Sequence, residues 1–170
     1  MATLLLVRHG RTGANASGVL SGRSAGVDLD EAGRQQARAL GERVARLRLA
    51  TVVSSPLERC VQTAAAVATA ASPVELDDRL TECDYGTWTG RSLTDLRREK
   101  LWRVVQDHPS GAVFPAGEPL RAMQSRAVEA VRDHDSRVEA VAGPDAVWMA
   151  VTHGDVIKAI VADALGLHLD

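Results

Sequence analysis

Short apolar runs alternate along the chain with longer amphipathic segments, and this alternation predicts strands and helices in turn. Four runs contain valine and are bounded by polar or turn-forming residues, as buried strands are. They are residues 3–7, 51–53, 73–76 and 147–151. The segment 77–90 is rich in Asp, Thr and Gly and is predicted to be a loop.

Between these runs, apolar positions recur at the three- and four-residue spacing of an amphipathic helix. Asp30 is a suitable N-cap for the first helix. In that helix Ala37, Leu40, Val44 and Leu47 recur at helical spacing. Ser55 and Pro56 form a helix-start signal, with Ser55 as the cap and Pro56 in the first helical position. Further helices are expected at residues 93–105, 120–141 and 156–165.

Strands that alternate with helices predict an α/β fold. We expect a three-layer sandwich, in which a mostly parallel central sheet is flanked by helices on both faces. The length of 170 residues suits a single domain that spans residues 1–170.

Composition narrows the class of protein and of partner. Apolar residues make up 45% of the chain, charged residues 25%, and the net charge is -2, as in an ordinary soluble protein. We therefore expect neither nucleic acid nor a membrane as partner. The apolar run near the N-terminus is too short for a signal peptide or a membrane span, so the chain is predicted to be cytoplasmic. Cys60 and Cys83 are interpreted as free thiols, with a disulfide between them as the alternative.

Charged and polar residues gather where the predicted strands end. Arg8 and His9 follow the first strand, Arg59 lies early in the helix after the second, and His153 follows the fourth. Open α/β sheets bind ligands at the carboxyl ends of their strands, so we expect these four side chains to converge. A cluster of this kind repels itself and needs an anion, and arginine forks match phosphate oxygens. Backbone N–H groups at helix starts are expected to contribute after Gly10, Pro56 and Gly154.

Structural roles are the alternatives for these residues. Arg8 could pair with a structural carboxylate, and His153 taken alone could be a core histidine. The remaining histidines lie in a loop before a proline, on a charge-rich helix and near the chain end, and they are interpreted as structural. They are His108, His134 and His168.

Five motifs follow one another from residue 3 to about residue 166. They are LVRHG at 6–10 with Thr12 and Asn15, SSPLER at 54–59 with QTA at 62–64, LTE at 80–82 with YG at 85–86 and WTG at 88–90, FPAGE at 114–118, and THG at 152–154 with VI at 156–157. In this order they resemble the signature of the histidine phosphatase superfamily, also called phosphoglycerate mutase-like. The segment 85–90 resembles the phosphatase branch more than the glycolytic mutases.

The resemblance implies a role for each matched position. His9 matches the nucleophile that becomes phosphohistidine, and Glu82 matches the proton donor. Arg8, Arg59 and His153 match the pocket that holds the phosphate and are expected to act in catalysis. The expected phosphate- and substrate-binding residues are Arg8, Asn15, Ser21, Gly22, Arg59, His153 and Gly154.

The chemistry is consistent with these roles. A neutral imidazole such as that of His9 is a good nucleophile near pH 7. The leaving alkoxide is strongly basic, so a nearby acid must protonate it, and Glu82 could then deprotonate the incoming water. Asp84 is the rival acid, two residues further on. A loop carboxylate in solvent or paired with an arginine is the structural alternative for Glu82.

We therefore expect a phosphatase that acts on a small phosphorylated metabolite with no metal and no cofactor. Arg8 and Arg59 should repel a divalent metal, which disfavours a metallohydrolase. A phosphoglycerate mutase type of phosphoryl transfer is the alternative. A non-catalytic phosphoester-binding module is disfavoured because nucleophile, acid and pocket residues are all present. A homodimer is left open.

Two features depart from the family pattern. Arg11 stands where many members carry Glu, which could favour substrates with a second anionic group. The chain ends at Asp170, soon after the last motif, whereas members often continue with another strand or helix. A C-terminal extension is therefore either missing or naturally absent.

Overall fold

The computed structural model describes residues 2–69 and 71–170. Its central sheet contains four strands, and every strand pair in it is parallel. The strands are β1 (Thr3–Arg8), β2 (Leu49–Ser54), β3 (Val74–Leu76) and β4 (Val147–Thr152), in the spatial order β1-β4-β2-β3. All four predicted strands are confirmed, and so is the α/β fold class.

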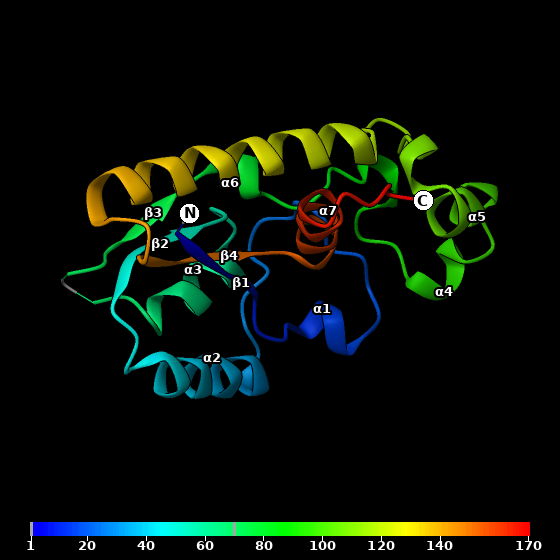
Figure 1. Ribbon diagram of the computed structural model, residues 1–170. Helices are drawn as coiled ribbons and strands as arrows, with labels where there is room; N and C mark the ends of the chain where they lie inside the picture. The colour runs from blue at the N-terminus through cyan, green and yellow to red at the C-terminus, as the bar shows by residue number, and fades with distance from the viewer. Residues whose placement is uncertain (1, 70) are drawn as a thin grey trace.

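Helices cover both faces of this sheet (Figure 1). The helices α2 (Glu31–Val44) and α3 (Glu58–Ala65) lie on one face. The helices α6 (Leu120–Ala142) and α7 (Gly154–Ala164) lie on the other. The predicted three-layer sandwich is therefore confirmed.

The central strand β4 shows why the layers form. Its side chains alternate between the two faces, as the two-residue period of a strand requires. Met149 and Val151 pack in the cluster with α2 and α3, whereas Trp148 and Ala150 pack in the cluster with α6. All four are fully buried, so a continuous apolar run rather than an alternating one marks this strand in the sequence.

The first helices show which of their bounds local sequence patterns predict correctly. Asp30 Oδ1 accepts a hydrogen bond from the Gly33 N–H at 2.7 Å, which confirms Asp30 as the N-cap of α2. The short helix α1 (Gly13–Ala16) was not predicted from periodicity, because four residues are too few to show a period. The helical spacing predicts that this helix continues to Leu47, but α2 ends at Val44 and Leu47 lies beyond it, 44% exposed.

Two helix predictions are wrong in their bounds. Ser55 does not cap α3, which begins at Glu58 without a side-chain cap, because the Ser55 hydroxyl contacts another element instead. The segment 93–105 forms two helices, α4 (Leu93–Leu96) and α5 (Lys100–Asp107). The break comes at Glu99, which has an extended backbone and accepts a hydrogen bond from Arg91 at 2.7 Å.

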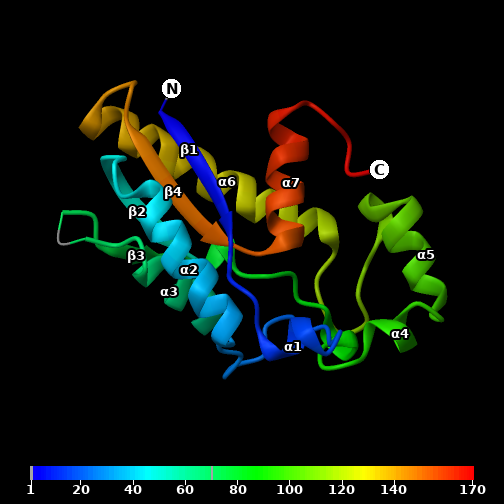
Figure 2. The same ribbon diagram turned by 90° about the horizontal axis from the view of Figure 1, so that it is seen from below.

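The segment between β3 and α6 forms a second packing unit beyond the strand ends. Figure 2 shows α1, α4 and α5 on this side of the molecule, and not over either face of the sheet. The segment also contains the 3-10 turns η1 (Asp78–Leu80), η2 (Gly86–Trp88) and η3 (Pro109–Gly111). Its buried side chains form one cluster with α7 and the first half of α6.

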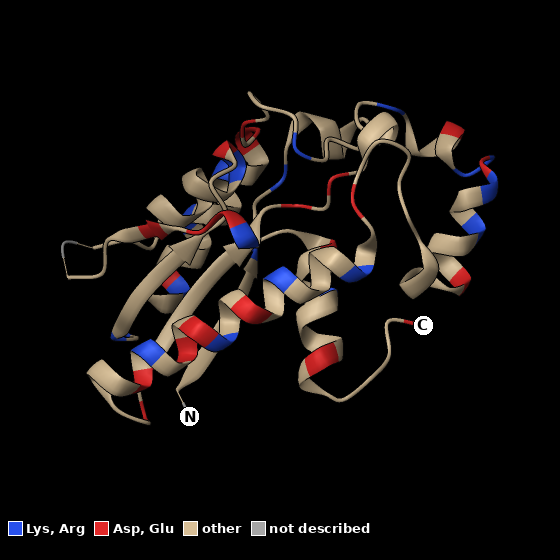
Figure 3. Cartoon of the chain, turned by 90° about the horizontal axis from the view of Figure 1, so that it is seen from above, with Lys and Arg blue, Asp and Glu red and all other residues tan. Residues whose placement is uncertain are grey.

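Charges are distributed without large blocks of one sign along α6, where positive and negative residues are interspersed (Figure 3). Within the described part of the chain, no helix combines the length and apolarity that crossing a membrane requires.

Candidate active site

His9 lies directly after β1 and is buried. Its Nδ1 lies 2.7 Å from the carbonyl oxygen of Gly10. Because a carbonyl can only accept, Nδ1 must donate, and the lone pair of the ring is then on Nε2. Burial lowers the pKa of His9 to about 4, with Arg59 and Arg8 adding to the effect of desolvation. At neutral pH the side chain is therefore a neutral imidazole with a free nucleophilic nitrogen.

The strand register places His153 next to His9. Arg8 of β1 pairs with Thr152 of β4, and the His9 N–H donates to the Thr152 carbonyl at 3.0 Å. The two histidines that follow these strands have ring centroids 5.3 Å apart. The recurrence of a strand followed by His-Gly therefore brings both rings to one edge of the sheet.

His153 is fully buried between two hydrogen-bonding partners. Its Nδ1 lies 3.2 Å from Arg59 Nη2, and its Nε2 lies 2.8 Å from the Ser55 hydroxyl. A guanidinium only donates, so Nδ1 accepts and Nε2 donates to Ser55. Desolvation lowers the pKa of His153 to about 2, with the charge of Arg59 as the next cause, so the ring is neutral.

Arg59 has donors without acceptors. Its Nη2 donates to the Gly22 carbonyl at 2.8 Å, but its buried Nε and Nη1 have no hydrogen-bond partner among the described residues. An unpaired buried donor, especially a charged one, is costly. The side chain is 1% exposed, so water does not relieve this cost freely. The arrangement favours an anion that accepts from the guanidinium beside both histidines.

Gly22 lies close to this site, where its carbonyl accepts from Arg59, and its backbone conformation requires a glycine. Its φ of +47° is strained for residues with a side chain, and a Cβ there would lie 2.8 Å from Thr89 Oγ1. Arg8 is more exposed and lies beside the start of α7, where a Cβ on Gly154 would be 3.6 Å from Arg8 Nε. Both residues, and Gly154, therefore lie at the edge where the histidines meet.

Glu82 is partly buried, beside the charged groups of Asp155, Arg59 and Arg8. Its Oε1 accepts from the Cys83 N–H at 3.0 Å. Burial raises the pKa of Glu82 to about 7, and the negative charge of Asp155 raises it further against the opposing effect of Arg59. A carboxyl group with this pKa holds a proton over much of the neutral range, as a general acid must.

Asp84, the rival acid, has a structural role because it accepts hydrogen bonds from two backbone N–H groups. Its Oδ1 accepts from the Gly86 N–H at 3.0 Å, and its carbonyl accepts from the Glu118 N–H at 2.9 Å. These bonds hold the turn at 85–86 against the FPAGE segment. The geometry therefore favours Glu82 over Asp84 as the candidate acid.

Arg126 of α6 holds the backbone that carries Glu82, and sequence reasoning missed it. It donates to the carbonyl oxygens of Arg79 at 2.6 Å, Thr81 at 2.7 Å and Glu82 at 3.1 Å. It also pairs with Glu118 at 2.6 Å. Arg23, likewise missed, donates to the same Glu82 carbonyl at 2.8 Å and pairs with Glu118 at 2.7 Å. Of the three residues Arg23, Glu118 and Arg126 that support the Glu82 backbone, only Glu118 belongs to a motif recognised in the sequence, FPAGE.

Two predicted phosphate ligands lie less directly at the site. Asn15 is exposed, and its Oδ1 accepts from the Thr12 N–H and hydroxyl in the capping box of α1. Ser21 precedes Gly22, and its carbonyl accepts from the Ser24 N–H at 2.9 Å. As substrate-binding residues, Asn15 and Ser21 stay predictions.

Two of the remaining three histidines pair with acidic side chains. Buried His134 on α6 lies 2.9 Å from Asp77 Oδ2, and exposed His108 lies 3.1 Å from Asp170 Oδ2. His168 is exposed near the chain end. These positions agree with the structural interpretation of His108, His134 and His168.

Both cysteines are free and buried, so the alternative of a disulfide between Cys60 and Cys83 is wrong. The Cys60 sulfur lies 3.5 Å from His153 Nε2, and burial raises the pKa of this thiol to about 12. Among residues 2–69 and 71–170, no group of three or more His, Cys, Asp or Glu is placed to hold a metal ion.

The unpaired donors of Arg59 generate a first prediction. Inorganic phosphate should raise the thermal midpoint of the wild-type chain, because the anion supplies the acceptors that the guanidinium lacks. At one hundred times its dissociation constant the expected shift is about 5–10 °C, from about 2.7 kcal/mol of linkage. Arg59→Met should abolish the shift, and Arg59→Lys should reduce it.

The matched control is Arg103→Met, because the Arg103 side chain is 87% exposed on α5. It should keep the full shift, as measured by scanning calorimetry at rising phosphate concentration. An undiminished shift in Arg59→Met would place the anion elsewhere.

Comparison with known proteins agrees with this geometry. The chain is 34% identical to the "Probable phosphoglycerate mutase GpmB" of Erwinia tasmaniensis, over 98% of this chain and 76% of that protein. It is 30% identical to a glucosyl-3-phosphoglycerate phosphatase of Mycolicibacterium vanbaalenii, with the same coverage of both chains. The solved structure of YhfR from Bacillus stearothermophilus superposes with a TM-score of 0.89 and 32% identity, over all of this chain and 83% of that one.

The profile of the histidine phosphatase superfamily (branch 1) matches residues 4–170, which takes in all the strand ends that carry the site. The chain therefore belongs to the histidine phosphatase superfamily.

Proposed function

We propose that the chain is a phosphatase that hydrolyses a small phosphate monoester through a phosphohistidine on His9, with Glu82 as proton donor. One observation carries the proposal. The buried Arg59 has two donor nitrogens, Nε and Nη1, without a hydrogen-bond partner among the described residues, at the edge of the sheet where a neutral His9 has its free nitrogen. The phosphatases named among the similar proteins support this choice of reaction.

In the first step, His9 Nε2 attacks phosphorus and forms the P–N bond while the P–O bond to the leaving group breaks. Glu82 gives its proton to the departing oxygen and becomes a carboxylate. Arg59 and Arg8 offset the negative charge of the phosphoryl oxygens as they approach the planar transition state.

His153 can adapt to the phosphoryl group through Ser55. A hydroxyl both donates and accepts, so the Ser55–His153 bond persists in either tautomer of the ring. In the second tautomer Nδ1 carries the proton and can donate to a phosphoryl oxygen, once Arg59 has turned its donors to the anion.

In the second step, water attacks phosphorus and the P–N bond breaks. The Glu82 carboxylate takes a proton from this water, and His9 recovers its lone pair as inorganic phosphate leaves. The first and second steps therefore use the same side chains in opposite protonation states.

We propose that neither step needs a metal ion or a cofactor. Two arginines at the phosphate site repel a divalent cation and already supply the charge that a metal would contribute. Cytoplasmic location and a homodimer stay predictions; free buried thiols at Cys60 and Cys83 agree with a reducing compartment.

A covalent phosphoryl group on His9 is the second prediction. Rapid quenching with labelled substrate should give an adduct that is labile in acid and stable in base, as a phosphoramidate is. The adduct should be absent from His9→Ala and present in His134→Ala, whose histidine belongs to α6. Label on a serine or cysteine would contradict the mechanism.

The third prediction concerns pH and Glu82. The pKa of Glu82 is raised, so the acid is present below about pH 7 and is lost as the pH rises through that value. For alkyl phosphates, kcat/KM should therefore fall above about pH 7. Glu82→Gln should remove this dependence and slow alkyl phosphates by about 10²–10⁴-fold, but aryl phosphates far less, since an aryl oxide departs with little protonation.

The comparison of Glu82→Gln with Asp84→Asn provides the control, because Asp84 caps the 85–86 turn. Equal losses on both classes of leaving group in Glu82→Gln, with a selective loss in Asp84→Asn, would reassign the acid to Asp84.

Independence of metal is the fourth prediction. Activity should survive EDTA without change, and vanadate should inhibit by mimicking five-coordinate phosphorus. Complete loss in EDTA with recovery in zinc or manganese would move the protein to the metallohydrolases.

The fifth prediction separates phosphatase from mutase. A mutase must exclude water while a bisphosphate turns around at the site, which requires an enclosing segment of chain. The segment between about residues 87 and 117, which contains α4 and α5, is the candidate for this role. We expect phosphate release from monoesters and little conversion of 3-phosphoglycerate, supplied with trace 2,3-bisphosphoglycerate and coupled to enolase. Rapid 2-phosphoglycerate formation without hydrolysis of any monoester would favour the mutase.

A further inference from the structure

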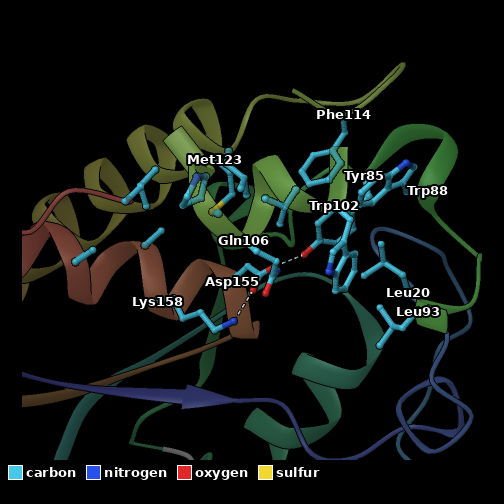
Figure 4. A pocket seen from close by; sticks show the side chains of 16 residues that line it. Leu20, Tyr85, Trp88, Leu93, Trp102, Gln106, Phe114, Met123, Asp155 and Lys158 are labelled. Atoms are coloured by element: carbon cyan, nitrogen blue, oxygen red, sulfur yellow. Dashed lines mark hydrogen bonds and ion pairs between the residues drawn. The ribbon is translucent and has the colours of Figure 1, made fainter. Parts of the chain in front are cut away.

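A cavity of about 440 Å³ lies between α5, α7 and the first turn of α6. Its wall is mostly aromatic and aliphatic, and Figure 4 shows these side chains turned toward a common space. Trp88 and Trp102 stack at 6.3 Å between ring centroids. Other prominent lining residues are Leu20, Leu93, Phe114 and Met123. This cavity, called the α5–α7 cavity below, has the size and lining of a small-molecule site.

Three segments that carry residues of the candidate active site also contribute to the wall of the α5–α7 cavity. Leu20 of its wall lies two residues before Gly22, whose carbonyl accepts from Arg59. Tyr85 lies three residues after Glu82 in the same loop. Asp155 lies two residues after His153, and the Tyr85 hydroxyl donates to it at 2.7 Å (Figure 4). A group that leaves phosphorus beside Glu82 therefore has this cavity as its neighbouring space.

Charge in the cavity wall is balanced. Lys158 is the only cation among the described residues that line it, and its Nζ lies 3.0 Å from Asp155 Oδ1. Gln106 is the remaining polar side chain with a long reach, and it is neutral. Arg11, which could have favoured a second anionic group, pairs with Asp30 at 2.7 Å. The wall therefore offers apolar surface and no unpaired cation for a carboxylate.

We infer that the α5–α7 cavity receives the leaving group and selects phosphate monoesters of uncharged, apolar alcohols or phenols. The inference rests on the proposed phosphatase function and gives it a substrate class. Phosphoglycerate and phosphoserine, which occur in the names of similar proteins, carry a carboxylate. In this wall that carboxylate would have to share Lys158 with Asp155 or remain unpaired against tryptophan.

Binding of unreactive analogues tests the inference apart from catalysis. The probes are n-alkylphosphonates from ethyl to hexyl, whose P–C bond cannot be hydrolysed, measured by isothermal calorimetry. The dissociation constant should fall by about two- to fourfold for each added methylene, as burial of a CH₂ predicts. A hexylphosphonate with a terminal carboxylate should bind more weakly than hexylphosphonate itself.

Three variants, one of them a control, locate the effect. Trp102→Ala should flatten the dependence on chain length to less than about twofold per methylene, whereas Leu101→Ala, on α5 but outside the lining, should keep it. Gln106→Lys adds an unpaired cation at an exposed lining position and should improve binding of the carboxylated probe relative to the neutral one. Circular dichroism and thermal midpoints confirm that each variant is folded.

Turnover measurements test the substrate class separately from the phosphatase function. The kcat/KM of n-alkyl phosphates should rise with chain length in the same way, because their leaving groups differ little in basicity. A flat series, or preference for the carboxylated probes in the wild-type chain, would overturn the substrate class and leave the phosphatase proposal standing. Chain-length-dependent phosphonate binding with no hydrolysis of any monoester would sustain the cavity assignment and overturn the phosphatase proposal.

Discussion

The buried guanidinium of Arg59 is the constraint on which the rest of the site depends. It carries a positive charge out of water, yet one carbonyl and one neutral histidine are its hydrogen-bonding partners among the described residues. Burial keeps both histidines unprotonated, and the charge of Arg59 adds to this effect because their protonated forms would face a second cation. The same charge makes an anion the natural ligand. The ligand class and the acceptor role of His153 Nδ1 therefore follow from one side chain, whereas the Gly10 carbonyl sets the tautomer of His9.

The candidate acid depends on a different set of contacts. Burial raises the pKa of Glu82, but a buried loop must still satisfy its backbone carbonyls. Arg126 and Arg23 do so by donating to the loop, and Glu118 balances their charge. The arginines contact the Glu82 carbonyl and not its carboxylate, so the loop is held rigidly while the carboxyl group keeps its proton.

The edge of the sheet and the segment between β3 and α6 have different proposed roles. The sheet edge presents the groups proposed to bind phosphate whatever the rest of the substrate is. The segment between β3 and α6 carries Glu82, the proposed acid, and part of the wall of the α5–α7 cavity, where the leaving group would lie. Tyr85 and Asp155 join these two parts by one hydrogen bond, and Asp155 also raises the pKa of Glu82. Substrate preference can therefore vary in one segment without altering the phosphate site.

The sequence by itself determined the parallel sandwich, the family and the residues at each strand end. Local sequence patterns predict these features: apolar runs, the Asp30 cap, and His-Gly after two buried strands. Only the tertiary structure decided that Ser55 contacts His153, 98 residues away, instead of capping α3. It also decided that Arg126 supports Glu82 across 44 residues, and that Trp88 and Trp102 close one cavity. Such contacts depend on strand register and helix packing, and these bring together residues whose separation along the chain follows no period.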